Sequence, residues 1–168
     1  QIELRLERDA ELPVIGVDAD KLDAEIANLL SNAMKFTPAG GTVEIKTVRG
    51  GDKQFRAQNL LDGNLQTYWA TDDSVTTPEV TLEFKQPVTF NIVSLQEFLP
   101  LGQRIGAFAL DEWKNGDWVQ FAAGTSIGSH RLWRGDNITT EKVRLRITES
   151  PVCPALAEFG LFQDASAM

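Results

Sequence analysis

Residues 48–73 read VRGGDKQFRAQNLLDGNLQTYWATDD, and this stretch divides the chain into two parts of different character. After it, short apolar runs alternate with turn residues up to residue 162. Before it, the pattern is that of a strand, a helix and a second strand. We therefore expect the stretch to open a β-rich domain that has a different origin from the N-terminal part.

The part after this stretch predicts a series of short antiparallel strands. Asn115-Gly116 is a strong two-residue hairpin signal between AFALDEW and WVQFA. The triplet Lys85-Gln86-Pro87 breaks the pattern between two earlier runs. The predicted strands are Val80–Phe84, Phe90–Leu95, Ala107–Trp113, Trp118–Ala122, Arg131–Trp133, Lys142–Ile147 and Ala157–Phe162. Strands of this length with regular turns predict a mainly β fold, either a β-sandwich or a jelly roll.

Composition excludes several classes of function. A net charge of −8 argues against nucleic-acid binding, which needs clustered Lys and Arg. No apolar run approaches the roughly 20 residues that span a bilayer, so no membrane partner is expected, and no secretory signal stands at Gln1. A single cysteine, Cys153, and a single histidine, His130, exclude an internal disulfide framework and a multi-histidine metal site. Localisation stays open.

Residues 48–162 resemble the discoidin-like module of coagulation-factor type C domains. The stretch LLDGNLQTYW is common across that superfamily, whereas VRGGD and GQRI are similar to the version that follows the catalytic barrel in α-L-fucosidases. Further similar stretches are FNIVSLQEFLPLGQRI, GTSIGSHRL, KVRLRITES and SPVCPALAEFGLF. The resemblance implies a non-catalytic accessory module. We expect no hydrolysis, because the family's catalytic barrel lies outside these stretches.

The N-terminal part predicts a strand-helix-strand unit. Residues 2–6 alternate as a strand does, Asp18 is a good helix N-cap, and Thr42–Val48 alternates again. The predicted helix places Leu22, Ile26, Leu29, Leu30 and Ala33 on one apolar stripe.

Within this part, NLLSNAMKFTP resembles the N box of sensor histidine kinases, in their ATP-binding domain. The resemblance implies that Asn32 would hold the magnesium of Mg-ATP and that Asn28 and Lys35 would face the nucleotide. The family's adenine-binding segment, its glycine-rich lid and its phosphoacceptor histidine have no counterpart here. We therefore expect a packed helix with a vestigial nucleotide face, and no ATP cofactor.

Taken together, the two resemblances indicate a chimera joined near Thr47–Val48. We expect two domains, a histidine-kinase ATPase-like βαβ fragment over residues 1–47 and a discoidin-like β-sandwich over residues 48–168. The apolar stripe of the first part would then pack on the sandwich. Otherwise it would form a homodimer, directly or by domain swapping.

The loop DGNLQT is a candidate site for a structural calcium ion. Its side chains Asp62, Asn64 and Thr67, together with Glu158 on the last predicted strand, supply oxygen ligands of the kind Ca²⁺ takes. The resemblance implies the same, because many discoidin-like modules hold calcium there. The alternative is a glycine turn in which Asp62 caps local N–H groups.

Candidate glycan-binding residues come from exposed aromatic and polar positions. Sugar-binding modules stack pyranose rings on aromatic side chains and bind the hydroxyl groups with Arg, Asp or Glu. We expect one of Trp113 and Trp118 to face outward, while Trp69 packs in the core. The candidates are Glu97, Arg104, Trp113 and Trp133. Each alone is also typical of an ordinary surface residue. His130 is expected in an exposed loop, and Cys153 as a buried thiol.

Three functions therefore compete. The first is a non-catalytic, carbohydrate-binding-like accessory module with a glycan partner. The second is a recombination product with no ligand, and the third is residual Mg-ATP binding by the N-box helix.

Overall fold

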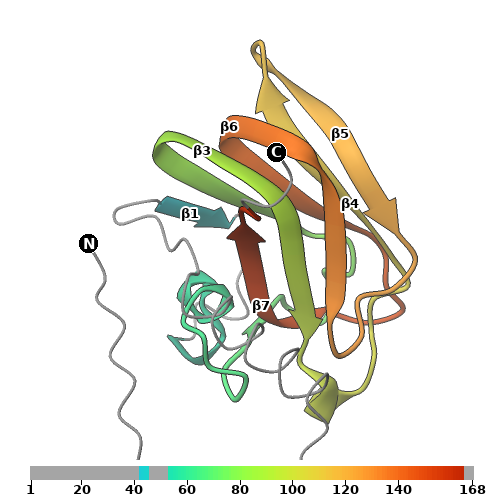
Figure 1. Cartoon of the computed structure of the whole chain (residues 1–168). Helices are drawn as coiled ribbons and strands as arrows, with labels where there is room; N and C mark the ends of the chain where they lie inside the picture. The colour runs from blue at the N-terminus through green and yellow to red at the C-terminus, as the bar shows by residue number, and fades with distance from the viewer. Residues whose placement is uncertain (1–41, 46–52, 165–168) are drawn as a thin grey trace, which may run out of the picture. The chain divides into compact units, whose positions relative to one another are not determined.

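The computed structural model describes residues 42–45 and 53–164, drawn in colour in Figure 1. The chain divides into two compact units, residues 1–33 and 34–168, and everything described here belongs to the second unit. The predicted N-terminal strand and helix lie outside the described residues, as do Asn28, Asn32 and Lys35. The predicted strand at Thr42 is present as a four-residue strand.

The described part is almost entirely antiparallel β-structure, which confirms the predicted fold class (Figure 1). Short 3₁₀ turns, η2 (Lys53–Phe55), η3 (Ala57–Leu60) and η4 (Leu99–Leu101), connect the strands. The strands are β1 (Thr42–Ile45), β2 (Trp69–Ala70), β3 (Glu79–Glu97), β4 (Ala107–Lys114), β5 (Asp117–Gly124), β6 (Arg131–Glu149) and β7 (Ala155–Phe162). No helix among the described residues is long and apolar enough to cross a membrane.

Two strands of 19 residues, β3 and β6, bend and take part in both layers of the sandwich. The first half of β3 pairs with β1 and with the end of β6, and β6 continues the layer to β4 and β5. The second half of β3 pairs with β7 and with the start of β6, and β2 completes that layer. All seven described strands belong to one sheet, in which each long strand carries residues into both layers.

The sequence predicted a break at Lys85-Gln86-Pro87, but the structure continues β3 through it. The β3–β6 register is interrupted between Glu83 and Val88, so these residues form the bend of the strand. Pro87 is tolerated because a residue outside the regular ladder has no strand hydrogen bond to donate. In the same way, the predicted strands Arg131–Trp133 and Lys142–Ile147 are the two ends of β6.

The core lies between the two layers, and the alternation of the strands fills it. Val80, Leu82 and Phe84 of β3 point inward, as do Val143 and Leu145 of β6, whereas the residues between them are more exposed. Trp69 is fully buried, as predicted. Its neighbours in the core include Leu60, Phe90, Leu95, Ile105, Leu110, Ile147, Leu156 and Phe159. The alternation leaves a second, polar face on the outside of the β3–β6–β4–β5 layer.

The predicted hairpin is present, with Asn115 at φ 54° and Gly116 at φ 86°. Positive φ at both central residues is the mark of the type I′ turn that Asn-Gly favours. The turn places Trp113 directly opposite Trp118. The hairpin therefore sets the position of the aromatic residues described next.

Candidate functional site

The outer face of the β3–β6–β4–β5 sheet carries an ion cluster centred on Asp111. The Asp111 side chain is only 2% exposed. Its carboxylate accepts hydrogen bonds from Arg144 Nε at 2.8 Å, from Arg146 Nε at 2.7 Å and from Arg146 Nη2 at 2.9 Å. Burial raises the pKa of Asp111, but the hydrogen bonds and charges of Arg146 and Arg144 outweigh burial and hold the pKa below its usual value. The cluster therefore stays ionised and fixes both guanidinium groups.

Beside the cluster, the two tryptophans of the hairpin form an edge-to-face pair. Their ring centroids are 5.1 Å apart, with an interplanar angle of 71°. Residues directly opposite on paired strands share a face of the sheet, so Trp113 and Trp118 point to the same side and both are half-buried. The sequence predicted that one of the two faces outward, and the structure places both on the same, outer side of the sheet.

Each tryptophan is covered by a cation from β6. The Arg144 guanidinium lies 4.5 Å from the Trp118 ring centroid, and Lys142 Nζ lies 5.8 Å from that of Trp113. Lys142 also forms an ion pair with Glu83 at 2.8 Å, and Arg144 reaches Glu79 at 3.4 Å. Both acids belong to β3, so four strands, β3, β4, β5 and β6, contribute to one surface.

These residues surround a hollow of about 230 Å³, which we name the tryptophan hollow. It combines two aromatic rings with carboxylate, ammonium, guanidinium and hydroxyl groups. Such a lining offers both an apolar contact surface and hydrogen-bond partners of either polarity. The lining residues are Glu79, Thr81, Glu83, Trp113, Trp118, Lys142 and Arg144.

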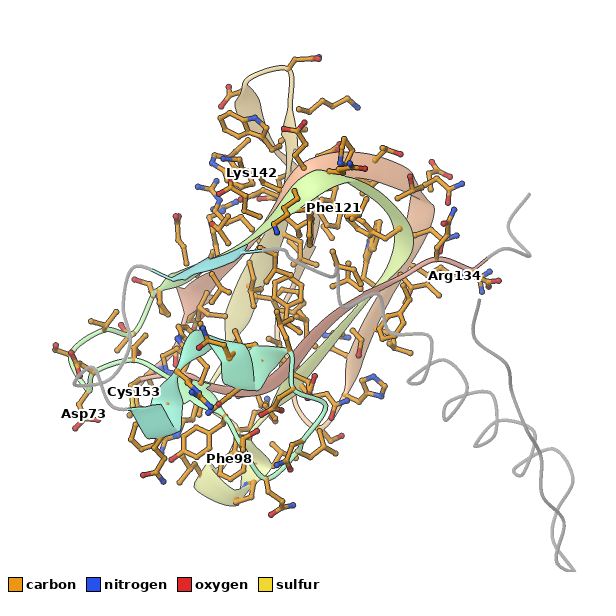
Figure 2. The ribbon with its side chains drawn as sticks, turned by 90° about the vertical axis from the view of Figure 1, so that its left-hand side faces the viewer. Asp73, Phe98, Phe121, Arg134, Lys142 and Cys153 are labelled. Atoms are coloured by element: carbon orange, nitrogen blue, oxygen red, sulfur yellow. The ribbon has the colours of Figure 1, made fainter. Side chains whose placement is uncertain are left out.

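The structure does not bring the four predicted glycan-binding residues together. Trp113 belongs to the tryptophan hollow, whereas Trp133 packs against Phe121 with ring centroids 4.8 Å apart. Glu97, at the end of β3, binds the backbone of Arg104, and the Arg104 side chain in turn reaches Cys153. In Figure 2, Lys142 and Phe121 are at one end of the domain, and Phe98 and Cys153 are at the other.

Glu97 has a structural role instead of the predicted sugar-facing one. It is 4% exposed, and its Oε1 accepts hydrogen bonds from the backbone N–H groups of Arg104 at 2.7 Å and Ile105 at 2.9 Å. Its Oε2 accepts a hydrogen bond from the Gly128 N–H at 2.7 Å. A buried carboxylate with three such donors fastens two loops to each other and does not fit a ligand-binding role.

The Arg104 side chain is likewise occupied inside the protein. Nη1 donates to the Cys153 carbonyl oxygen at 3.1 Å, and Nε donates to the Leu101 carbonyl oxygen at 3.2 Å.

Cys153 is a buried thiol, as predicted. His130 is exposed, as predicted, and its Nε2 lies 2.8 Å from Oγ of Ser94, a partner that the sequence did not indicate.

The predicted calcium loop closes on its own hydrogen bonds. Asp62 accepts from the Asn64 N–H at 2.8 Å and from the Thr67 hydroxyl at 2.7 Å, and the Thr67 N–H and hydroxyl both donate to the Asn64 carbonyl oxygen. Glu158 lies on β7 and is buried.

The types of donor in this loop fit Ca²⁺, although both Asp62 oxygens already accept a hydrogen bond. Within the described part of the chain, no group of three or more His, Cys, Asp and Glu side chains could hold a metal ion. A calcium site would therefore depend on amide, hydroxyl and carbonyl oxygens as well as on carboxylates.

Sequence reasoning missed the charged half of the tryptophan hollow. In KVRLRI the residues Lys142, Arg144 and Arg146 alternate with apolar residues, so they share one face. Glu79 and Glu83 follow the same alternation on β3. The signal was present in the sequence, but it required knowledge of which strands are neighbours.

Comparison with known protein families identifies the fold. Residues 44–159 match the sequence profile described as F5/8 type C domain. The chain belongs to the F5/8 type C domain family. Its F5/8 type C domain covers all the strands described above except the first two residues of β1 and the last three of β7.

The chain is similar to two further groups of curated proteins. Alpha-L-fucosidase 1 of Arabidopsis thaliana is 32% identical over 126 residues, which are 73% of this chain and 25% of that protein. The chain thus spans about a quarter of the length of this fucosidase. A separate similarity joins 45 residues, 27% of this chain, to the adaptive-response sensory kinase SasA of Synechococcus sp. (strain JA-3-3Ab), with 42% identity over 12% of the kinase.

Solved structures show the same fold. A GH29 fucosidase of Ruminococcus gnavus in complex with fucose superposes with a TM-score of 0.74 and 27% identity, over 89% of this chain and 31% of the fucosidase. The family 32 CBM from C. perfringens NanJ in complex with galactose has a TM-score of 0.62 and 18% identity, over 72% of this chain and 92% of that module. The predicted resemblance to a discoidin-like fucosidase module is confirmed.

Proposed function

We propose that the F5/8 type C domain of this chain is a non-catalytic, glycan-binding accessory module and that the tryptophan hollow receives the sugar. The observation that carries the proposal is the side-by-side arrangement of Trp113 and Trp118 with Lys142 and Arg144 above their rings. A sugar ring presents C–H groups on its faces and hydroxyl groups around its edge. The hollow offers aromatic surface for the first and charged hydrogen-bond partners for the second.

The ion cluster makes this surface rigid before a ligand arrives. Asp111 fixes Arg144 through a partly buried hydrogen bond, and Arg144 in turn lies over Trp118. A preorganised site loses little side-chain freedom on binding, and this matters for a ligand that offers only a few weak contacts.

The family comparisons support the same function. Domains with this fold include one solved in complex with galactose, and the chain is similar to part of fucosidases of both plant and bacterial origin. We infer that the module acts by holding a glycan and that it carries out no bond cleavage itself.

We also propose that the chain is a chimera, in which a kinase-like N-terminal fragment precedes the F5/8 type C domain. The 45-residue similarity to a sensory kinase supports this origin. Long-read sequencing of the gene at its genomic locus tests it, because a junction that is absent from genomic DNA would show that the fusion arose outside that genome.

Isothermal titration after a glycan-array screen that includes fucose and galactose tests the glycan-binding function. We expect a sugar to bind the intact chain and Trp118→Ala to weaken binding by at least about fivefold, as for an aromatic residue at the centre of an interface. Leu132→Ala is the matched control, because Leu132 is also an exposed apolar residue but lies outside the hollow. Equal losses in the two variants, or no binding of any sugar on the array, would refute the proposal.

A further inference from the structure

A second hollow, of about 360 Å³, lies next to the same hairpin, and we name it the Trp133 hollow. It is lined by residues of β4, β5 and β6, namely Glu112, Lys114, Phe121, Trp133, Asp136, Asn137, Ile138 and Thr139. Glu112 and Lys114 alternate with Trp113 along β4, so they point to the opposite side of the strand. The β4–β5 hairpin therefore separates the two hollows.

The aromatic wall of this hollow is held in place by packing. The Trp133 ring lies against Phe121, with a centroid distance of 4.8 Å, and Phe121 packs on the core residue Phe90 at 5.9 Å. The indole also lies against Gly135, where an added Cβ would come within 2.3 Å of the ring. Only glycine leaves room for this ring position, so the sequence at Gly135 and the orientation of Trp133 are linked.

The charges of the Trp133 hollow do not cancel. Lys114 Nζ lies 3.7 Å from Glu112 Oε1 and offsets that carboxylate. The nearest other cation in sequence, Arg134, forms an ion pair with Asp164 at 2.7 Å. Asp136 is exposed and has no ion pair or hydrogen bond within the described residues. The hollow thus combines a fixed indole ring with an uncompensated carboxylate.

A carboxylate beside an aromatic ring favours a positively charged ligand, because the cation is attracted by the carboxylate and by the face of the ring. The tryptophan hollow differs, since its two acidic residues are each paired with a cation. We propose that the Trp133 hollow is a second sugar subsite that selects an amino sugar, whose ammonium group faces Asp136. This inference rests on the proposed glycan-binding function and adds the class of sugar.

The two subsites lie on opposite sides of one hairpin, because Glu112 and Lys114 alternate with Trp113 along β4. A single sugar ring does not reach both hollows, whereas an oligosaccharide that passes the Asn115-Gly116 tip does. The chain should therefore prefer a glucosamine oligomer to the monosaccharide. The gain reflects the effective concentration that linkage provides.

The test compares a glucosamine tetramer with an N-acetylglucosamine tetramer by isothermal titration at about pH 6. The two probes share ring and linkage, and only the first carries ammonium groups. We expect the cationic tetramer to bind the intact chain on the order of tenfold more tightly, with a preference that decreases as salt rises. Asp136→Asn should remove the preference, and Gly135→Ala, which displaces the Trp133 ring, should weaken the binding of both tetramers.

Glu141→Gln is the matched control, because it removes one exposed carboxylate of β6 outside the hollow. It should keep the preference for the cationic tetramer. Equal affinity for the two tetramers, or a preference that Asp136→Asn leaves intact, would overturn the inference. If a neutral sugar still binds and Trp118→Ala weakens it, only the amino-sugar subsite fails. If no sugar binds at all, the proposed function fails as well.

Discussion

Replacement of Asp111 by Asn is the most informative test of how the binding surface is built. Asp111 accepts three hydrogen bonds of 2.7–2.9 Å from Arg144 and Arg146, whereas Glu79 reaches Arg144 only at 3.4 Å. Asparagine has nearly the same shape but no charge, and its amide would place N–H donors next to guanidinium donors. The substitution therefore removes the anion that bridges the two cations, and Arg144 keeps its longer ion pair with Glu79.

The magnitude follows from the burial of the three side chains. Removal of one partner of a buried ion pair costs about 3–5 kcal/mol. Asp111 is 2% exposed, but Arg144 and Arg146 are 18% and 28% exposed, so their charges can reach water after the substitution. We therefore expect a loss near the lower end, about 3 kcal/mol. This corresponds to a decrease in Tm of roughly 6–12 °C for a chain of this size.

Thermal and urea unfolding of the intact chain, followed by circular dichroism, measure this loss. Glu141→Gln serves as the control, because the same change of charge at an exposed residue should alter stability by less than about 0.5 kcal/mol. A loss below about 1 kcal/mol in Asp111→Asn would refute the view that this cluster stabilises the outer face. A second readout is sugar affinity, which should decrease because Arg144 loses its fixed position over Trp118.

Three further predictions follow from other parts of the structure. The pKa of Asp111 is below its usual value, so its contribution to the free energy of unfolding is complete above about pH 4 and is lost as the pH falls through the folded-state pKa. In urea titrations, the stability difference between the native chain and Asp111→Asn should therefore shrink below about pH 4. A difference that stays constant down to pH 2 would contradict this. Gly124→Ala should destabilise the chain by about 1–3 kcal/mol in thermal unfolding, because an added Cβ would lie 2.7 Å from the Phe108 ring. The control Gly63→Ala has open space around the new Cβ and should cost only the strain of its positive φ. Equal losses of stability in the two variants would show that the contact at Phe108 is unimportant. We propose that calcium occupies the DGNLQT loop. Millimolar Ca²⁺ should therefore raise the Tm of the native chain, and it should raise the Tm of Asp62→Ala much less. An identical rise in both proteins would exclude a site at Asp62.

The predictable part of the fold is the part set by local chemistry. Asn115-Gly116 determines a type I′ turn by itself. The turn brings the residues before and after it into register, so the pairing of β4 with β5 follows from the local sequence. Strict alternation in VTLEF and KVRLRI fixes which residues are buried, whatever the partner strand is. Trp69 was expected in the core from the resemblance of LLDGNLQTYW to the superfamily, and it is fully buried.

The bend of β3 could not be read from the sequence in the same way. Lys85-Gln86-Pro87 is a turn signal in isolation, and proline normally ends a strand. In the folded chain, the pairing of β3 with β6 on both sides of the bend keeps the strand continuous. Long-range pairing therefore overrides a local signal at this position.

The candidate site was predictable only in its aromatic part. Trp113 was selected because it flanks a hairpin, and it does belong to a hollow on the surface. Glu97 was selected because a carboxylate can bind sugar hydroxyl groups, but three backbone N–H groups bind its carboxylate. A carboxylate faces solvent or binds backbone N–H groups according to which distant segments pack against it, and for Glu97 these segments contain Arg104 and Gly128. The local sequence around Glu97 does not contain that information.

A sugar titration followed by the NMR signals of the tryptophan indole N–H groups shows directly whether the tryptophan hollow receives the sugar. The chain has four tryptophans, and single alanine variants of Trp113, Trp118 and Trp133 assign their signals. We expect the signals of Trp113 and Trp118 to shift in a saturable way, while that of the buried Trp69 stays in place. Saturable binding with no shift of the Trp113 and Trp118 signals would place the sugar elsewhere and refute the proposed role of the tryptophan hollow.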